Sequence, residues 1–241
     1  GSGFSRTGGP KPEERNIISG NTYAGINVCG SMFTDNLILG NYIGTDASGL
    51  RGIGNLGQGI YIHRADNIVI GPGNIIAFNG GDGILICAQS NHNTIVKNDV
   101  HDNGGNGLSV RANSLGNRIT HNSVYDNGGN GIWLCNRGNA ELSEPTILDF
   151  DLRDGTVTGA ATANCTVEIY SDGGKEGEIF EGQTAADDMG FFILDKGSPF
   201  TGPHLTATAC DEGGDTSGFS APTEGLGTPL VLQGGDDLRR T

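Results

Sequence analysis

The sequence predicts an all-β protein in which a right-handed parallel β-helix precedes a small antiparallel β-sandwich. Three observations lead to this fold class. A five-residue motif, glycine–apolar–variable–apolar–variable, recurs every 24 residues, with copies that begin at Gly59, Gly83, Gly107 and Gly131. The chain contains 43 glycines without a collagen triplet, which indicates many tight turns. All of its asparagines except Asn164 lie within residues 16–139, so the composition changes near residue 140.

Each copy of the motif predicts a short strand with alternate residues pointing into a core. In residues 83–87 the inward positions are Ile84 and Ile86. A fixed period in this range is typical of a solenoid, because one short coil cannot bury its own apolar residues. Stacking about five coils at the strand spacing of ~4.8 Å produces a continuous core. The right-handed sense follows from the general crossover preference.

Two columns of asparagine mark bends between the strands. Asparagine tolerates left-handed backbone geometry, and stacked amides can hydrogen-bond from coil to coil. One column stands four residues before the first glycine of each motif and contains Asn21, Asn55, Asn79, Asn103 and Asn127. The other stands five residues earlier and includes Asn74, Asn98 and Asn122. We expect both columns to form structural ladders.

The 24-residue period divides the chain into four parts. Residues 1–15 read as an N-terminal extension or truncated start, residues 16–142 as the β-helix, residues 146–222 as the β-sandwich and residues 223–241 as a flexible tail or linker. Short strands separated by Asp-Gly and Gly-Gly turns predict the sandwich. We expect these strands at residues 155–160, 166–170, 178–186, 191–194, 205–210 and 217–221.

Several segments resemble known families. Residues 15–21 (RNIISGN) and 40–46 (GNYIGTD), with the Asn-Gly-Gly-Asn-Gly turns, resemble the PbH1 repeats of right-handed parallel β-helix proteins of the pectate-lyase-like superfamily. Residues 188–192 (DMGFF), 206–209 (TATA) and 215–220 (DTSGFS) are similar to the Ig-like domain that often follows such β-helices as an accessory or spacer. The resemblance implies a secreted or cell-surface, bacterial protein. It specifies the fold and leaves the function open.

Charge and hydropathy exclude some functions. The formal net charge is −14 and no Lys/Arg cluster exists to neutralise phosphates, so we expect no nucleic-acid partner. No apolar run approaches the ~20 residues that span a bilayer. The sequence contains no signal peptide, and Gly1 and Ser2 are typical of a cloning remnant, so we expect the natural N-terminus to lie upstream.

The cysteines give one candidate disulfide. Cys29, Cys87 and Cys135 share a coil position but not adjacent coils. Alternate coils lie ~9.6 Å apart, beyond the ~7 Å that a disulfide spans between Cα atoms, so these three do not bridge. Cys165 and Cys210 end two strands of the sandwich and form a disulfide if those strands pair antiparallel with both sulfurs on one face.

We predict neither a metal site nor a cofactor. His63 lies between Cys29 and Cys87 in the stacked column, but the coil spacing of ~4.8 Å is too long for neighbouring ligands of one zinc ion. An insertion at residues 45–54 contains Asp46, and a single acidic residue makes a poor calcium cage. Ca²⁺ is compatible with this loop but not indicated by it.

Candidate catalytic residues are few. Asp102 and Asp126 stack in one column at ~4.8 Å, near the spacing of a retaining glycosidase pair, and His101 is adjacent. Both aspartates also lie beside tight turns, where Asp is a common turn former. We therefore favour no catalytic residues, with a polysaccharide lyase or glycoside hydrolase using these three as the alternative.

The preferred reading is a secreted or cell-surface structural or adhesive module without catalytic activity. The variable positions of the repeated motif lie on one outward face of the β-helix. The larger residues at these positions, Tyr61, Leu85 and Trp133, form the expected binding face for polysaccharide or another surface protein. A third possibility is a self-assembling filament subunit that associates through uncapped β-helix ends.

Overall fold

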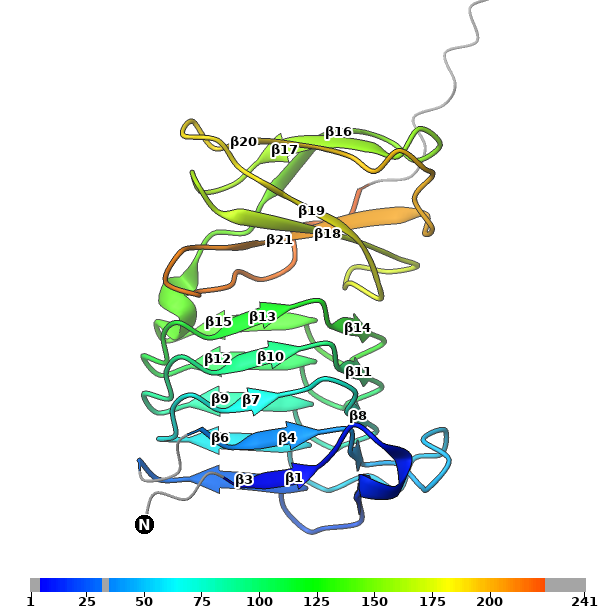
Figure 1. The fold of residues 1–241 in the computed structure, drawn as a ribbon, viewed down its shortest axis with the longest axis vertical. Coiled ribbons are helices and arrows are strands. Elements are labelled where there is room, and N and C mark those ends of the chain that lie inside the picture. Colours follow the sequence, from blue (N-terminus) through cyan, green and yellow to red (C-terminus); the bar gives the residue numbers. More distant parts are fainter. Residues whose placement is uncertain (1–4, 32–34, 224–241) are drawn as a thin grey trace, which may run out of the picture.

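The computed structural model describes residues 5–31 and 35–223. Three parallel sheets of five strands wind into a column, and two three-stranded antiparallel sheets lie beyond one end of it (Figure 1). Two short 3₁₀ turns, η1 (Pro12–Glu14) and η2 (Gly138–Glu141), are the helical elements of this part of the chain. The all-β class and the parallel coils are therefore confirmed. No helix among these residues is long and apolar enough to cross a membrane.

Each coil contributes one strand to each of three sheets, which we call A, B and C. Sheet A consists, in order, of β1 (Arg6–Gly8), β4 (Leu37–Leu39), β7 (Val69–Ile70), β10 (Thr94–Val96) and β13 (Arg118–Thr120). Sheet B consists of β2 (Ile17–Ile18), β5 (Tyr42–Ile43), β8 (Ile75–Ala77), β11 (Asp99–His101) and β14 (Ser123–Tyr125). Sheet C consists of β3 (Ile26–Cys29), β6 (Ile60–His63), β9 (Ile84–Cys87), β12 (Leu108–Arg111) and β15 (Ile132–Cys135).

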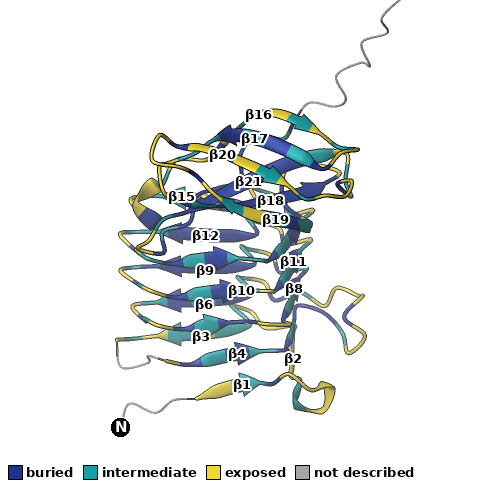
Figure 2. Cartoon of the chain, turned by 45° about the horizontal axis from the view of Figure 1, so that its top comes forward, coloured by how far each residue is buried: buried dark blue, intermediate teal, exposed yellow. Residues whose placement is uncertain are grey.

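The repeated five-residue motif forms sheet C and places its apolar residues in the core. Ile60, Ile84 and Leu108 are consecutive partners in register, and each is at most 1% exposed. Burying such a side chain stabilises the fold by about 1.5–3 kcal/mol. Figure 2 shows the resulting pattern, with buried residues along the strands and exposed residues gathered at the bends.

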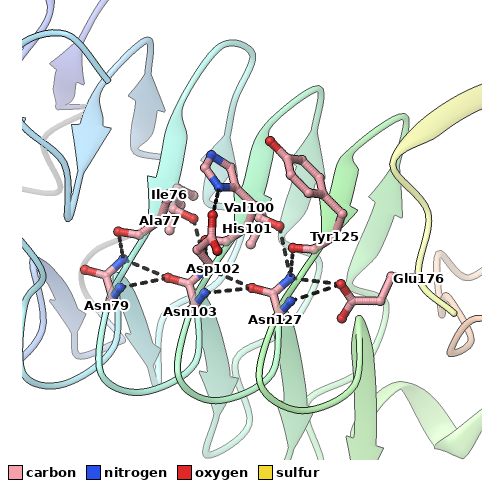
Figure 3. Close-up of polar contacts among 10 residues, drawn as sticks. All are labelled: Ile76, Ala77, Asn79, Val100, His101, Asp102, Asn103, Tyr125, Asn127 and Glu176. Atoms are coloured by element: carbon pink, nitrogen blue, oxygen red, sulfur yellow. Dashed lines mark hydrogen bonds and ion pairs between the residues drawn. The ribbon is translucent and has the colours of Figure 1, made fainter. Parts of the chain in front are cut away.

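The bend asparagines form hydrogen-bonded ladders along the column. Asn79 Nδ2 donates to Asn103 Oδ1 over 2.9 Å, and Asn103 Nδ2 donates to Asn127 Oδ1 over 3.0 Å (Figure 3). The backbone N–H of Asn79 donates to the same Asn103 oxygen over 3.2 Å. Each amide oxygen thus satisfies two donors of the preceding coil, which fixes the coil spacing.

The other two bends also contain asparagine ladders. The second ladder continues along the column through Asn74, Asn98 and Asn122. A third ladder, which the sequence analysis did not identify, joins Asn93, Asn117 and Asn139. Its last step spans 22 residues and not 24, so it breaks the period at the end of the β-helix.

The insertion at residues 45–54 folds back onto sheet B. Thr45 and Gly52 form an antiparallel bridge at its base. Asp46 Oδ1 accepts hydrogen bonds from the backbone N–H and the hydroxyl of Ser48, at 3.0 and 2.6 Å, and so stabilises its own turn. Gly49 lies against the Tyr42 ring so closely that an added Cβ would meet it at 3.0 Å. The loop therefore lies against Tyr42 and Ile75 on the outer surface of sheet B.

The antiparallel strands form a separate small core. One sheet contains β16 (Thr146–Asp151), β17 (Thr156–Ala160) and β20 (Phe191–Asp195), and the other contains β19 (Ile179–Ala185), β18 (Thr166–Asp172) and β21 (His204–Cys210). Side chains from both sheets, including Val157, Ile169 and Phe192, make up one buried cluster. The strand at Thr146–Asp151 was not predicted from the sequence, and the strand expected at residues 217–221 is absent from the described structure.

The antiparallel unit closes the C-terminal end of the β-helix. Tyr170 and Phe219 belong to the β-helix core cluster, at 3% and 9% exposure. The unit also supplies polar partners for the last coil: Thr216 Oγ1 accepts from the Ile119 N–H at 3.0 Å. These contacts replace the coil that would otherwise follow, so the unit caps this end of the β-helix.

The N-terminal end begins earlier than expected. The sequence pattern predicts that residues 1–15 lie outside the β-helix, but β1 pairs in parallel with β4, with Thr7 opposite Ile38. An end strand packs on one side only and needs few apolar residues, so its polar sequence concealed it. In the described structure β1, β2 and β3 are each the last strand of their sheet. These three strands form the N-terminal edge of the described column, and the antiparallel unit covers the other end.

Candidate functional site

The candidate catalytic histidine lies on the outer face of sheet B within an aromatic stack. His101 stands between Phe78, whose ring is edge-on with centroids 5.7 Å apart, and Tyr125, whose ring is stacked at 4.8 Å. Its Nδ1 lies 2.8 Å from Asp102 Oδ2, as Figure 3 shows. Only 12% of the His101 side chain is exposed. The stack and the aspartate therefore fix the imidazole in place.

The two candidate aspartates occupy equivalent bend positions in consecutive coils. Asp102 and Asp126 both have φ of 52°, and Phe78, one coil earlier, has φ of 60°. Asp tolerates this left-handed geometry better than most residues, which accounts for its presence at the bend. The structure brings Asp102 together with His101, whereas Asp126 is exposed one coil further along.

A further carboxyl group, missed by the sequence analysis, belongs to the same surface. Asp99 precedes His101 by two residues on β11, so both point outward, and its carboxyl group lies close to the Tyr125 hydroxyl. Burial raises the pKa of Asp99, whose Oδ1 is buried without a hydrogen-bond partner in the part of the chain that the structure describes. The two-residue alternation that located the core could have identified this residue.

The phenol of Tyr125 is held in its neutral form. Burial is the main cause that raises its pKa, and the negative charges of Asp99, Glu178 and Asp102 raise it further. A neutral phenol donates a hydrogen bond and cannot act as a base. The surface therefore offers a hydrogen-bond donor and an aromatic ring.

Beside Tyr125 the last coil and the cap enclose a hollow of about 380 Å³. We call it the corner hollow; it is lined by Tyr125, Asp126, Asn127 and residues 172–176 and 178. The cap loop is fixed to the coil by paired backbone hydrogen bonds between Val124 and Gly177, each 2.9 Å long. The volume of the corner hollow lies in the range of small-ligand sites.

Carboxylates dominate the lining of the corner hollow. Asp126 and Glu178 are exposed, whereas Asp172 and Glu176 are buried. The Asp172 oxygens accept from the backbone N–H groups of Gly174, at 2.7 Å, and Glu176, at 2.8 Å. Within residues 5–31 and 35–223, no group of three or more His, Cys, Asp or Glu is placed to hold a metal ion.

The binding face predicted on sheet C needs correction. Leu85 is 1% exposed, while Trp133 is 37% exposed and Tyr61 is half-buried. Leu85 lies directly opposite Tyr61 of the preceding coil, and neighbours at strand spacing cover much of each other's surface. The three residues therefore do not form one exposed apolar face. Trp133 instead lines a separate hollow with Glu141.

All five cysteines are free thiols in the structure. In the outward column of sheet C, Cys29 Sγ lies 3.5 Å from His63 Nδ1, and Cys87 Sγ lies 3.5 Å from the Tyr61 hydroxyl. In the cap, Cys210 lies opposite Thr166 in the strand register. Cys165 precedes Thr166 in the chain and therefore lies diagonally across from Cys210. Burial raises the pKa of both cap thiols. The structure thus contains no disulfide between them, and the offset register argues against the one expected conditionally from the sequence.

Comparison with known proteins identifies the family. The model of the right handed beta helix region matches residues 8–147 and 44–177, so the chain belongs to this family. No curated protein matches the chain.

The similar solved structures include the A-modules of two mannuronan C-5 epimerases from Azotobacter vinelandii. AlgE4 is 25% identical over 47% of this chain and 29% of that chain, with a TM-score of 0.41. AlgE6 is 26% identical over 52% and 34%, with a TM-score of 0.43. The enzymatically active domain of tailspike protein 2 from bacteriophage CBA120 is 12% identical over 90% and 50%, with a TM-score of 0.27. The chain thus spans about a third of the epimerase modules.

Proposed function

We propose that this protein is a non-catalytic, extracellular or cell-surface binding module that holds a carbohydrate chain at the corner hollow. The observation that carries the proposal is the hollow itself, where a half-buried Tyr125 adjoins several side chains that hydrogen-bond. Sugar recognition combines these features, since an aromatic ring packs on the sugar face and polar groups bind its hydroxyls. A site of this size accommodates a short stretch of a glycan.

The chemistry of the surrounding groups favours binding over turnover. The Tyr125 phenol stays protonated, and the His101 ring is packed between two aromatic rings. A retaining hydrolase requires two carboxyl groups about 5–5.5 Å apart across the scissile bond. Here Asp102 is engaged by His101, and both bend aspartates are explained by their backbone geometry.

The test is a glycan array followed by a turnover assay on every glycan bound. Tyr125→Ala removes the ring that borders the hollow, and Trp133→Ala serves as the matched aromatic control on sheet C. We expect binding without products, lost in the first variant and kept in the second. Equal binding by both variants would place the carbohydrate elsewhere and refute the site.

An enzyme that cleaves polysaccharide is the second candidate. The observation in its favour is Asp99, whose raised pKa and unpartnered oxygen suit a general acid beside His101 and Asp102. The same assays decide it, because new reducing ends or unsaturated products that disappear in Asp99→Asn would establish catalysis and overturn the binding-only proposal.

Self-association is the third candidate, in a narrower form than a filament. The cap covers the C-terminal end, while the N-terminal edge of the described residues has a hollow of about 360 Å³ lined by Ile26, Val28 and Ile38. These apolar groups and the unpaired strand edges suit contact between two N-terminal ends. A dimer in sedimentation analysis that Val28→Lys abolishes is the expected result, and a monomer at every concentration contradicts it.

We further propose that the cap is an Ig-like domain and that the β-helix belongs to the pectate-lyase-like superfamily. Two facing three-stranded antiparallel sheets around a shared core support the first assignment. The three-sheet coil with asparagine ladders supports the second.

A further inference from the structure

The corner hollow has an uneven charge distribution. Four carboxylates line it, on Asp126, Asp172, Glu176 and Glu178, against one ammonium group, on Lys175. Walls of low dielectric concentrate such a field and favour a cationic ligand. A glycan that contains uronic acids would meet charge repulsion at this position.

One buried oxygen of Glu176, a residue that lines the hollow, lacks a hydrogen-bond partner among the described residues. Glu176 is 4% exposed, and its Oε2 accepts from the Asn127 backbone N–H at 3.2 Å and from the Asn127 side chain at 3.4 Å. Its Oε1 is buried and has no hydrogen-bond partner within residues 5–31 and 35–223. Leaving a buried acceptor unpaired is unfavourable, and a donor on a bound ligand would remove that cost.

The position of Glu176 is fixed by the fold. Its carboxylate ends the ladder that runs through Asn79, Asn103 and Asn127, as Figure 3 shows. Its backbone N–H donates to Asp172 Oδ2 over 2.8 Å. The free oxygen therefore cannot turn away to find another donor without breaking the ladder end.

The spacing of the carboxylates argues against a single metal ion. No group of three acidic, His or Cys residues in the described part of the chain converges closely enough to hold one. The four groups instead share a hollow of about 380 Å³, which is larger than an ion needs. A cationic group on an organic ligand fits this arrangement better.

We propose that the corner hollow binds an amino sugar with a free ammonium group, as found in a deacetylated hexosamine glycan. The inference rests on the proposed carbohydrate-binding function and names its ligand class. The ammonium group donates to the unpartnered Glu176 Oε1 and is surrounded by the remaining carboxylates. The Tyr125 ring adjoins the sugar face.

Calorimetric titration with three probes tests the proposal: a glucosamine trimer, the corresponding N-acetylglucosamine trimer and trilysine. We expect the glucosamine trimer to bind at least about tenfold more tightly than the other two, since a charged hydrogen bond is worth about 1.5–3 kcal/mol. Glu176→Gln places an amide at the ligand and is expected to remove most of this preference. Salt should weaken the interaction with the glucosamine trimer.

Glu168→Gln is the matched control. Glu168 is also a buried carboxylate at the junction of cap and β-helix, where it accepts from the His121 N–H at 3.0 Å and from the Tyr170 hydroxyl. It does not line the hollow. Its replacement perturbs the junction in a similar way but should leave the affinity for the glucosamine trimer within about twofold, as expected for a site without ligand contact.

The outcomes separate this inference from the proposed function. Equal affinity for the two trimers, lost in Tyr125→Ala, overturns the amino-sugar inference and leaves a carbohydrate site. Trilysine binding as tightly as the glucosamine trimer overturns it in favour of a cationic peptide. An equal loss in Glu176→Gln and Glu168→Gln shows a structural effect and contradicts the direct contact. Absence of binding to all three probes overturns the inference, while the array still decides whether another glycan binds.

Discussion

Replacing Asn103 with alanine tests whether the asparagine ladders hold the coils together. Asn103 is 1% exposed, and its Oδ1 accepts from both the backbone N–H and the side chain of Asn79. Its Nδ2 donates to Asn127 Oδ1 at 3.0 Å and to the carbonyl oxygen of Ile76 at 2.9 Å. The substitution leaves these groups buried without that partner.

The expected loss follows from the number of orphaned groups. Each buried polar group left unpaired costs about 1–3 kcal/mol, and some of these groups retain a second partner. We therefore expect Asn103→Ala to lower the free energy of unfolding by about 2–5 kcal/mol, a large share of the 5–15 kcal/mol that is typical of a domain.

Urea denaturation followed by circular dichroism measures this change. Asn130→Ala is the control, because Asn130 is exposed and the hydrogen bond that it makes to Asn106 Oδ1 comes from its backbone N–H, which alanine keeps. It should stay within about 0.5 kcal/mol of the parent. A loss for Asn103→Ala as small as that of the control would refute the structural role of the ladder.

Three further predictions concern the core, the cap and the thiols. Ile84→Ala should cost about 2–5 kcal/mol in denaturation, whereas Ile193→Ala, at an exposed site, should cost under about 0.5; equal losses would contradict the assigned core. Burial raises the pKa of Glu176 above its ordinary 4.5, so the folded state binds this proton more tightly and stability should fall as pH rises from about 4.5 through the folded pKa. Denaturation from pH 4 to 7 should show a shallower fall for Glu176→Gln, and identical slopes would refute this origin. Alkylation after unfolding without reductant should label both Cys165 and Cys210, since their strand register is offset; a mass showing them linked would contradict that expectation.

The β-helix was predictable because its signal is repeated. Each coil contains the five-residue motif and a ladder asparagine, so Asn79, Asn103 and Asn127 could be aligned without a structure. The third ladder was missed because Asn139 follows Asn117 by 22 residues and leaves the period. Local pattern therefore predicts the stacked coils and fails where the stack ends.

The cap and the hollow depend on contacts between distant parts of the chain. Thr216 bonds Ile119 across 97 residues, and Glu176 bonds Asn127 across 49 residues. No sequence period links these pairs. The expected face on sheet C failed for a different reason: alternation shows that Leu85 points outward but cannot show that its neighbours cover it.

The most direct test of the central claim is mass spectrometry of a glycan mixture retained on immobilised protein. The account predicts that the retained chains keep their original length distribution, and that immobilised Tyr125→Ala retains none of them. Shortened or unsaturated chains would show catalysis, and equal retention by the variant would show that the corner hollow is not the binding site.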